Sequence, residues 1–116
     1  MKKPNVLCIC AKGMNRSRYL SEYLKELKYK TKYGGVEGYK KELGKAPNQI
    51  TQKEINWSDL IIITRKRLES IFKKLFNIKD KRILVFDIPD LTEYGESNKT
   101  KEILKKTIKP YLPLKK

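Results

Sequence analysis

Histidine is absent from this chain, and its two cysteines, Cys8 and Cys10, lie two positions apart. A zinc site therefore has no plausible ligand set, and nothing in the sequence calls for a metal or another cofactor. Without an imidazole, proton transfer near neutral pH falls to carboxylates, thiols, tyrosine or lysine. We predict that the two cysteine side chains face opposite sides of a strand and form no disulfide with each other.

Long apolar runs are also missing, since none approaches the roughly 20 residues that a membrane-spanning helix needs. The opening residues lead into a strand-like run without the apolar core of a signal peptide, so we expect a cytoplasmic protein with no membrane partner.

Acidic residues are scarce as well: 28 Lys and Arg stand against 13 Asp and Glu, a net charge of +15. This charge permits an acidic or nucleic-acid-associated partner, although solvated, lysine-rich helix faces are the simpler explanation.

Apolar periodicity predicts one domain, 1–116, in which strands alternate with helices. A capping box at Thr51 and Glu54 marks one helix start. The predicted strands are 5–9, 32–36, 59–64 and 82–86; the predicted helices are 17–30, 52–57, 65–75 and 98–111, with a loop at 38–48. Continuously apolar strands between helices indicate an α/β fold, a parallel sheet covered on both faces. Ligands of such sheets bind beyond the carboxyl ends of the strands, where Cys10, Asp87 and Asp90 fall.

Residues 10–17 carry the pattern on which most of the functional interpretation depends. Cys10 and Arg16 bracket five residues in the segment Cys-Ala-Lys-Gly-Met-Asn-Arg-Ser, directly after an apolar strand and before a predicted helix. A short loop with a glycine can turn its backbone N–H groups inward, toward the point at which the next helix aims its positive N-terminus. A phosphate held there would sit over the sulfur, and the guanidinium would close on it with a bidentate fork.

This loop, the segment at 50–62 that contains Trp57-Ser58-Asp59, and the stretch Asp87-Ile88-Pro89-Asp90 together resemble the low-molecular-weight protein tyrosine phosphatase family. The similarity runs from about residue 4 to 112 and is greatest with a short branch of predicted tyrosine phosphatases. The resemblance implies a three-layer domain with a four-stranded parallel sheet in the order 2-1-3-4. It also implies metal-independent hydrolysis of phosphate monoesters through a phosphocysteine, with a phosphorylated protein or a small aryl phosphate as substrate.

By this resemblance Cys10 is the nucleophile, Arg16 binds the equatorial phosphate oxygens, and Ser17 hydrogen-bonds the thiolate. From the residues alone, Ser17 could equally be the N-cap of the helix. The second loop cysteine of the better-known members is replaced by Asn15, which puts their redox switch within the loop in doubt here. The implied phosphate-binding residues are Ala11, Lys12, Gly13, Met14, Asn15, Arg16 and Ser17.

The leaving group needs a proton, and the family takes it from an Asp-Pro loop followed by tyrosines and a glycine. Here the order is inverted to Pro89-Asp90, with Tyr94 and a glycine after it. Counting back from Tyr94 favours Asp90, whereas counting from the end of the preceding strand favours Asp87. We predict Asp90 as the general acid, with Asp87 as the alternative. Tyr94 is predicted to line the leaving-group pocket, with an exposed loop tyrosine as the alternative.

Three other functions fit parts of the sequence. The phosphocysteine carrier of sugar phosphotransferase systems has a similar strand, cysteine loop and helix, but it lacks an arginine at the position of Arg16. Arsenate reduction on the same fold needs further cysteines, and none follows Cys10. A catalytically weak relative that binds nucleic acid or another polyanion would explain the net charge, although no RNA-binding signature is present.

Overall fold

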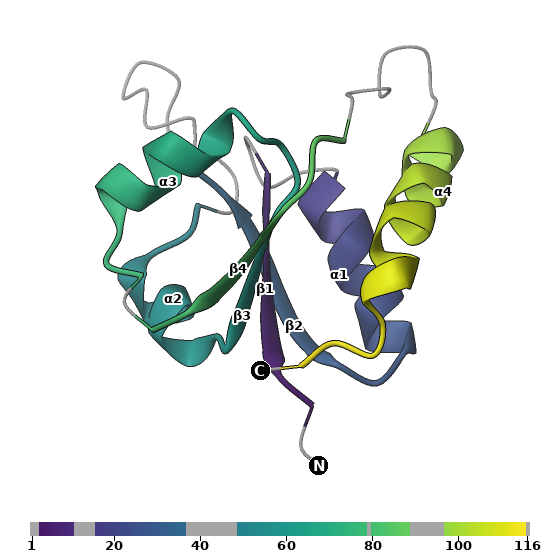
Figure 1. Ribbon diagram of the computed structural model, residues 1–116, viewed down its shortest axis with the longest axis horizontal. Helices are drawn as coiled ribbons and strands as arrows, with labels where there is room; N and C mark the ends of the chain where they lie inside the picture. The colour runs from purple at the N-terminus through teal and green to yellow at the C-terminus, as the bar shows by residue number, and fades with distance from the viewer. Residues whose placement is uncertain (1–2, 11–15, 37–48, 79, 89–96, 116) are drawn as a thin grey trace.

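The structure is a computed structural model that describes residues 3–10, 16–36, 49–78, 80–88 and 97–115 (Figure 1). Its strands pair in parallel in the order β2-β1-β3-β4, which confirms the predicted topology. The strands are β1 (Asn5–Cys10), β2 (Lys30–Gly35), β3 (Leu60–Ile63) and β4 (Arg82–Val85). The helices are α1 (Arg16–Glu26), α2 (Gln52–Trp57), α3 (Leu68–Leu75) and α4 (Ser97–Ile108), followed by a 3-10 turn, η3 (Lys109–Tyr111).

Two apolar clusters pack on opposite faces of this sheet, because strand side chains alternate between its faces. In β1, Val6 belongs to the cluster under α1 and α4, whereas Leu7 and Ile9 belong to the cluster under α2 and α3. Figure 1 shows the two helix pairs on either side of the sheet. The predicted α/β fold with helices on both faces is therefore confirmed. Across the described ranges, no helix is both long and apolar enough to span a membrane.

Cys8 and Cys10 point to the same face of the sheet, so the prediction of opposite faces was wrong. Residues two apart on a strand share a face. Cys8 packs in the cluster with Leu20 and Leu24 of α1, and the sulfur of Cys10 contacts Ser17 on that helix. At about 3.3 Å per residue along a strand, the Cα atoms of the two cysteines lie about 6.6 Å apart, near the upper limit for a disulfide. Both thiols are free, as expected.

The first helix ends at Glu26, four residues before the predicted end at 30. The chain stops with Lys28 in the left-handed region, at φ 73°. Two hydrogen bonds close this cap: Lys28 N–H donates to Lys25 O at 2.9 Å, and Tyr29 N–H donates to Leu24 O at 3.0 Å. Glycine is the usual residue at such a position, and the lysine here hid the helix end from the sequence pattern.

Three further boundaries differ by two or more residues. The capping box is confirmed at Thr51 and Glu54. β2 begins at Lys30 rather than at 32, and α3 begins at Leu68 rather than at 65. The last helix ends at Ile108, and residues 109–111 tighten into the 3-10 turn. The predicted loop at 38–48 lies outside the described residues.

Candidate active site at the end of the first strand

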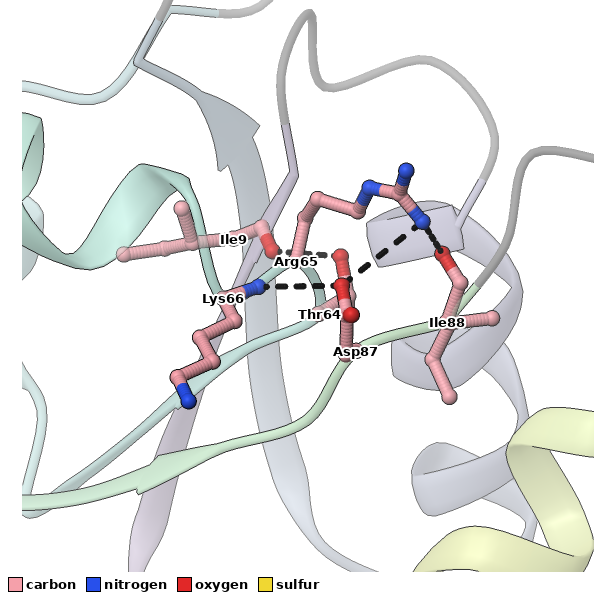
Figure 2. A network of polar contacts seen from close by, with 6 residues as sticks. All are labelled: Ile9, Thr64, Arg65, Lys66, Asp87 and Ile88. Atoms are coloured by element: carbon pink, nitrogen blue, oxygen red, sulfur yellow. Dashed lines mark hydrogen bonds and ion pairs between the residues drawn. The ribbon is translucent and has the colours of Figure 1, made fainter.

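Hydrogen bonds from the residues that directly follow both neighbouring strands hold the backbone around Cys10. On one side, Thr64 donates twice to Ile9 O, from its backbone N–H at 2.9 Å and from Oγ1 at 2.8 Å, the bond drawn in Figure 2. On the other side, Val36 N–H donates to Cys10 O at 3.3 Å. Ile9 O belongs to the peptide unit that precedes Cys10, and Cys10 O to the one that follows it. The position of the thiol at the carboxyl end of β1 is thereby fixed from both sides.

The Cys10 side chain meets the first turn of α1. Its Sγ lies 3.0 Å from Ser17 Oγ, and either atom can be the donor. Ser17 is fully buried, and Arg16, the first residue of α1, is 8% exposed. Ser17 is the second residue of α1 and not its N-cap, because the helix begins at Arg16, and its hydroxyl contacts the sulfur. The first turn of α1 contains no acidic residue, so its positive end favours a thiolate or another anion there.

The structure brings Cys10 and Ser17 of the predicted site into direct contact and places Arg16 next to Ser17, as the first residue of α1. Both helix residues are buried. The predicted general acid Asp90 and the predicted pocket residue Tyr94 lie outside the described residues. So does the middle of the predicted phosphate loop, Ala11, Lys12, Gly13, Met14 and Asn15.

Asp87, the alternative acid, is held at the junction between β3 and α3 (Figure 2). Its Oδ1 lies 3.6 Å from Arg65 Nη1 and accepts a hydrogen bond from Lys66 N–H at 3.4 Å, while the side chain stays 62% exposed. The same Arg65 Nη1 donates to Ile88 O at 3.1 Å. Arg65 therefore ties the end of β4 to the end of β3. The sequence analysis missed this contact; the available signal was that Arg65 and Asp87 each follow a predicted strand.

The second thiol, that of Cys8, lies two residues before Cys10 in β1 and is fully buried. Burial raises the pKa of the Cys8 thiol far above its ordinary value, and the neighbouring Cys10 raises it further. A thiol that stays protonated is a poor nucleophile. Cys8 is thus a core residue, which leaves Cys10 as the candidate nucleophile at this end of the sheet.

The rate of alkylation should distinguish the Cys10 thiol from the Cys8 thiol. We expect iodoacetamide near neutral pH to label Cys10 in the native protein and to leave Cys8 unlabelled until the protein is unfolded, because burial keeps the Cys8 thiol protonated. Peptide mapping by mass spectrometry gives the labelled position. Inorganic phosphate should slow the labelling of Cys10 if an anion binds over its sulfur. Labelling of both thiols at similar rates in the folded protein would contradict this assignment.

No protein-family model matches this chain, and no curated protein sequence matches it. Solved structures do match. Wzb of Vibrio vulnificus, in complex with benzylphosphonate, superposes with a TM-score of 0.78 at 15% identity over 95% of this chain and 97% of its own. The tyrosine phosphatase Wzb of Escherichia coli K30, in complex with phosphate, gives a TM-score of 0.75 at 15% identity over 95% and 96% of the two chains.

A third match acts on a different residue type. The serine phosphatase of the RNA polymerase II C-terminal domain from Drosophila melanogaster superposes with a TM-score of 0.64 at 12% identity, covering 98% of this chain and 86% of its own. At these identities the matches establish the fold. The chain therefore has the fold of the low-molecular-weight tyrosine phosphatases, two of which also match it, as its sequence suggested. Related folds serve more than one phosphorylated substrate.

Proposed function

We propose that this protein is a metal-independent cysteine phosphatase that hydrolyses phosphate monoesters, with aryl phosphates such as phosphotyrosine as its substrates. The observation that carries the proposal is the 3.0 Å contact between Cys10 Sγ and Ser17 Oγ at the start of α1. It puts a potential nucleophile beside a helix N-terminus, where an anion is stabilised. Arg16, at the same helix start, supplies the guanidinium that a phosphate monoester needs.

In the proposed reaction the Cys10 thiolate attacks phosphorus and forms an S–P bond while the P–O bond to the leaving group breaks. Arg16 and the loop N–H groups stabilise the charge on the equatorial oxygens. The leaving oxygen takes a proton from Asp90. Water then attacks the phosphocysteine and gives a proton to the Asp90 carboxylate, and the S–P bond breaks to release phosphate and the thiolate. Ser17 stabilises that thiolate by donating its hydroxyl hydrogen.

The choice of aryl phosphates is supported by the matching structures. Two of them, with the fold of this chain, are a tyrosine phosphatase bound to phosphate and a homologue bound to benzylphosphonate, an aryl-bearing phosphonate. The serine phosphatase with a related fold makes alkyl phosphates the natural comparison in any assay. A phosphorylated protein and a small aryl phosphate both satisfy this chemistry.

Turnover of para-nitrophenyl phosphate in the presence of EDTA tests the proposal. We expect multiple turnovers that orthovanadate inhibits, because vanadate mimics the trigonal bipyramid at phosphorus. A carrier protein would instead accept phosphate from a partner without turning over this substrate. Affinity for RNA that survives Cys10→Ser, in a protein with no phosphatase activity, would point to a polyanion-binding relative and contradict the proposal.

The two candidate acids can be separated by the basicity of the leaving group. We expect Asp90→Asn to slow phenyl phosphate roughly tenfold or more beyond its effect on para-nitrophenyl phosphate, because the more basic phenolate depends on a proton. Asp87→Asn, the matched control, should slow both substrates equally and modestly, since it weakens the contacts to Arg65 and Lys66. If Asp87→Asn shows the leaving-group dependence, the assignment reverses. If each variant slowed phenyl phosphate and para-nitrophenyl phosphate by the same factor, neither aspartate would be the general acid.

A further inference from the structure

Two cations from different elements share one tyrosine ring beside the start of α1. Arg18 Cζ lies 5.2 Å from the centroid of the Tyr19 ring, and Lys101 Nζ, from α4, lies 4.8 Å from it. One helical turn further along, Lys105 Nζ lies 5.3 Å from the centroid of the Tyr23 ring. Figure 1 shows α1 and α4 side by side, and the two lysine contacts cross between these helices, whereas the arginine contact lies within α1. The tyrosines hold the cations in place through cation–π attraction.

The shared ring lies close to the proposed phosphate site. Tyr19 is three residues after Arg16, which corresponds to about 4.5 Å along the helix axis. An extended peptide advances about 3.3 Å per residue. Side chains within about three positions of a phosphorylated residue bound at Cys10 would therefore come within reach of Arg18 and Lys101.

Among the described residues, the carboxylate nearest to Arg18 does not cancel this charge. Glu22 Oε1 is 3.9 Å from Arg18 Nε, a loose and exposed pair, and the Arg18 side chain remains 43% exposed. Over their full lengths, α1 and α4 carry seven basic residues against three acidic ones. The two helices together therefore carry four more positive than negative charges, and Arg18 and Lys101 lie near the start of α1, which contacts Cys10.

The chemistry of the patch favours a carboxylate-bearing peptide over a nucleic acid. Single-stranded nucleic acids gain much of their affinity by stacking bases on exposed aromatic rings. Here the Tyr19 ring carries two cations and the Tyr23 ring carries one, so these rings already have charged neighbours at stacking distance. A carboxylate, by contrast, can be bound by the arginine and lysine cations alone and needs no exposed ring.

We infer that Arg18 and Lys101, held by Tyr19, form a docking subsite that selects phosphorylated peptide segments with acidic side chains within about three residues of the phosphorylated residue. This inference rests on the proposed phosphatase function and names the substrate class of that site. The subsite lowers KM for acidic segments and leaves small aryl phosphates unaffected, because they do not extend beyond the phosphate site.

Peptide kinetics on the full chain test the inference. Two phosphotyrosine peptides are compared, one with aspartate and glutamate around the phosphotyrosine and one with serine and glutamine there. We expect the wild-type protein to prefer the acidic peptide in kcat/KM by about tenfold at low salt, mainly through KM, and to lose part of this preference as salt screens the charges. Lys101→Gln should lower the preference about threefold, and Lys101→Glu should remove it.

Lys106→Glu is the matched control, because Lys106 is exposed on the same helix, five positions further on and about 140° around it. It changes the net charge as much as Lys101→Glu does, yet should keep at least half of the preference. Turnover of para-nitrophenyl phosphate should stay within about twofold of wild type in all three variants. This turnover tests the proposed phosphatase function separately from the subsite. If the wild-type protein did not turn over para-nitrophenyl phosphate, the phosphatase proposal itself would be wrong.

Three results would overturn the subsite. One is a wild-type protein with equal kcat/KM for both peptides. Another is an equal loss in Lys101→Glu and Lys106→Glu, which would assign the effect to overall charge. The third is tight, Lys101-dependent retention of single-stranded RNA without any preference between the peptides, which would replace the acidic peptide with a nucleic acid.

Discussion

Replacement of Cys10 by serine is expected to lower turnover of para-nitrophenyl phosphate by about 10³-fold or more, while orthovanadate binding stays within about tenfold of wild type. A serine hydroxyl is not ionised near neutral pH and no histidine is available to take its proton, so the S–P bond has no counterpart. Anion binding persists because Arg16 and the start of α1 are unchanged. Steady-state kinetics and calorimetric titration measure the two quantities.

Cys8→Ala provides the matched control for this variant. It removes the other thiol, two residues earlier on the same face of β1, and exchanges it for a small apolar side chain that the cluster can hold. We expect its turnover to stay within about threefold of wild type, with some loss of thermal stability from the cavity. A Cys10→Ser protein that kept its rate within about tenfold would show that Cys10 is not the nucleophile.

Arg16→Ala should lower kcat/KM by about 10³-fold, with affinity for phosphate and rate falling together. The guanidinium at the start of α1 would contact the phosphoryl group in the ground state and more strongly as its charge shifts to the equatorial oxygens. Arg16→Lys should recover less than a tenth of the loss, because an ammonium is a point charge and cannot form the planar fork. Substrate saturation curves for both variants separate kcat from KM.

Arg82→Lys is the control for that exchange, since Arg82 begins β4, at the end of the sheet away from Cys10. It should leave kcat and KM unchanged within about twofold. If Arg16→Lys retained most of the wild-type rate, Arg16 would act only as a positive charge, and the bidentate contact would be wrong.

The parallel sheet could be predicted because its two central strands, β1 and β3, are nearly continuously apolar and buried on both faces. Leu60-Ile61-Ile62-Ile63 is the clearest case, and all four residues are fully buried. The strand order was implied by the family resemblance. Helix ends were harder to predict wherever tertiary contacts or an unusual cap set them. Lys28 takes a left-handed conformation that a sequence pattern assigns to glycine.

At the candidate site, the sequence sufficed for groups that are close along the chain. The contact between Cys10 and Ser17, seven positions apart, was implied by the family resemblance of this strand, loop and helix. Contacts between distant segments could not be predicted, because a single sequence does not reveal which side chains meet. The Arg65–Asp87 pair and the Lys101–Tyr19 contact are of this kind. Both depend on which elements lie side by side, which the strand order and the helix packing determine.

The most direct test of the account is to identify the atom that carries phosphate during turnover. Wild-type protein, mixed with saturating para-nitrophenyl phosphate in EDTA and quenched rapidly in denaturant, should yield a peptide spanning Cys10 with one added phosphoryl group. That peptide should be absent from Cys10→Ser. Turnover without phosphate on Cys10, or with phosphate on another residue, would contradict the central claim that its thiolate attacks phosphorus.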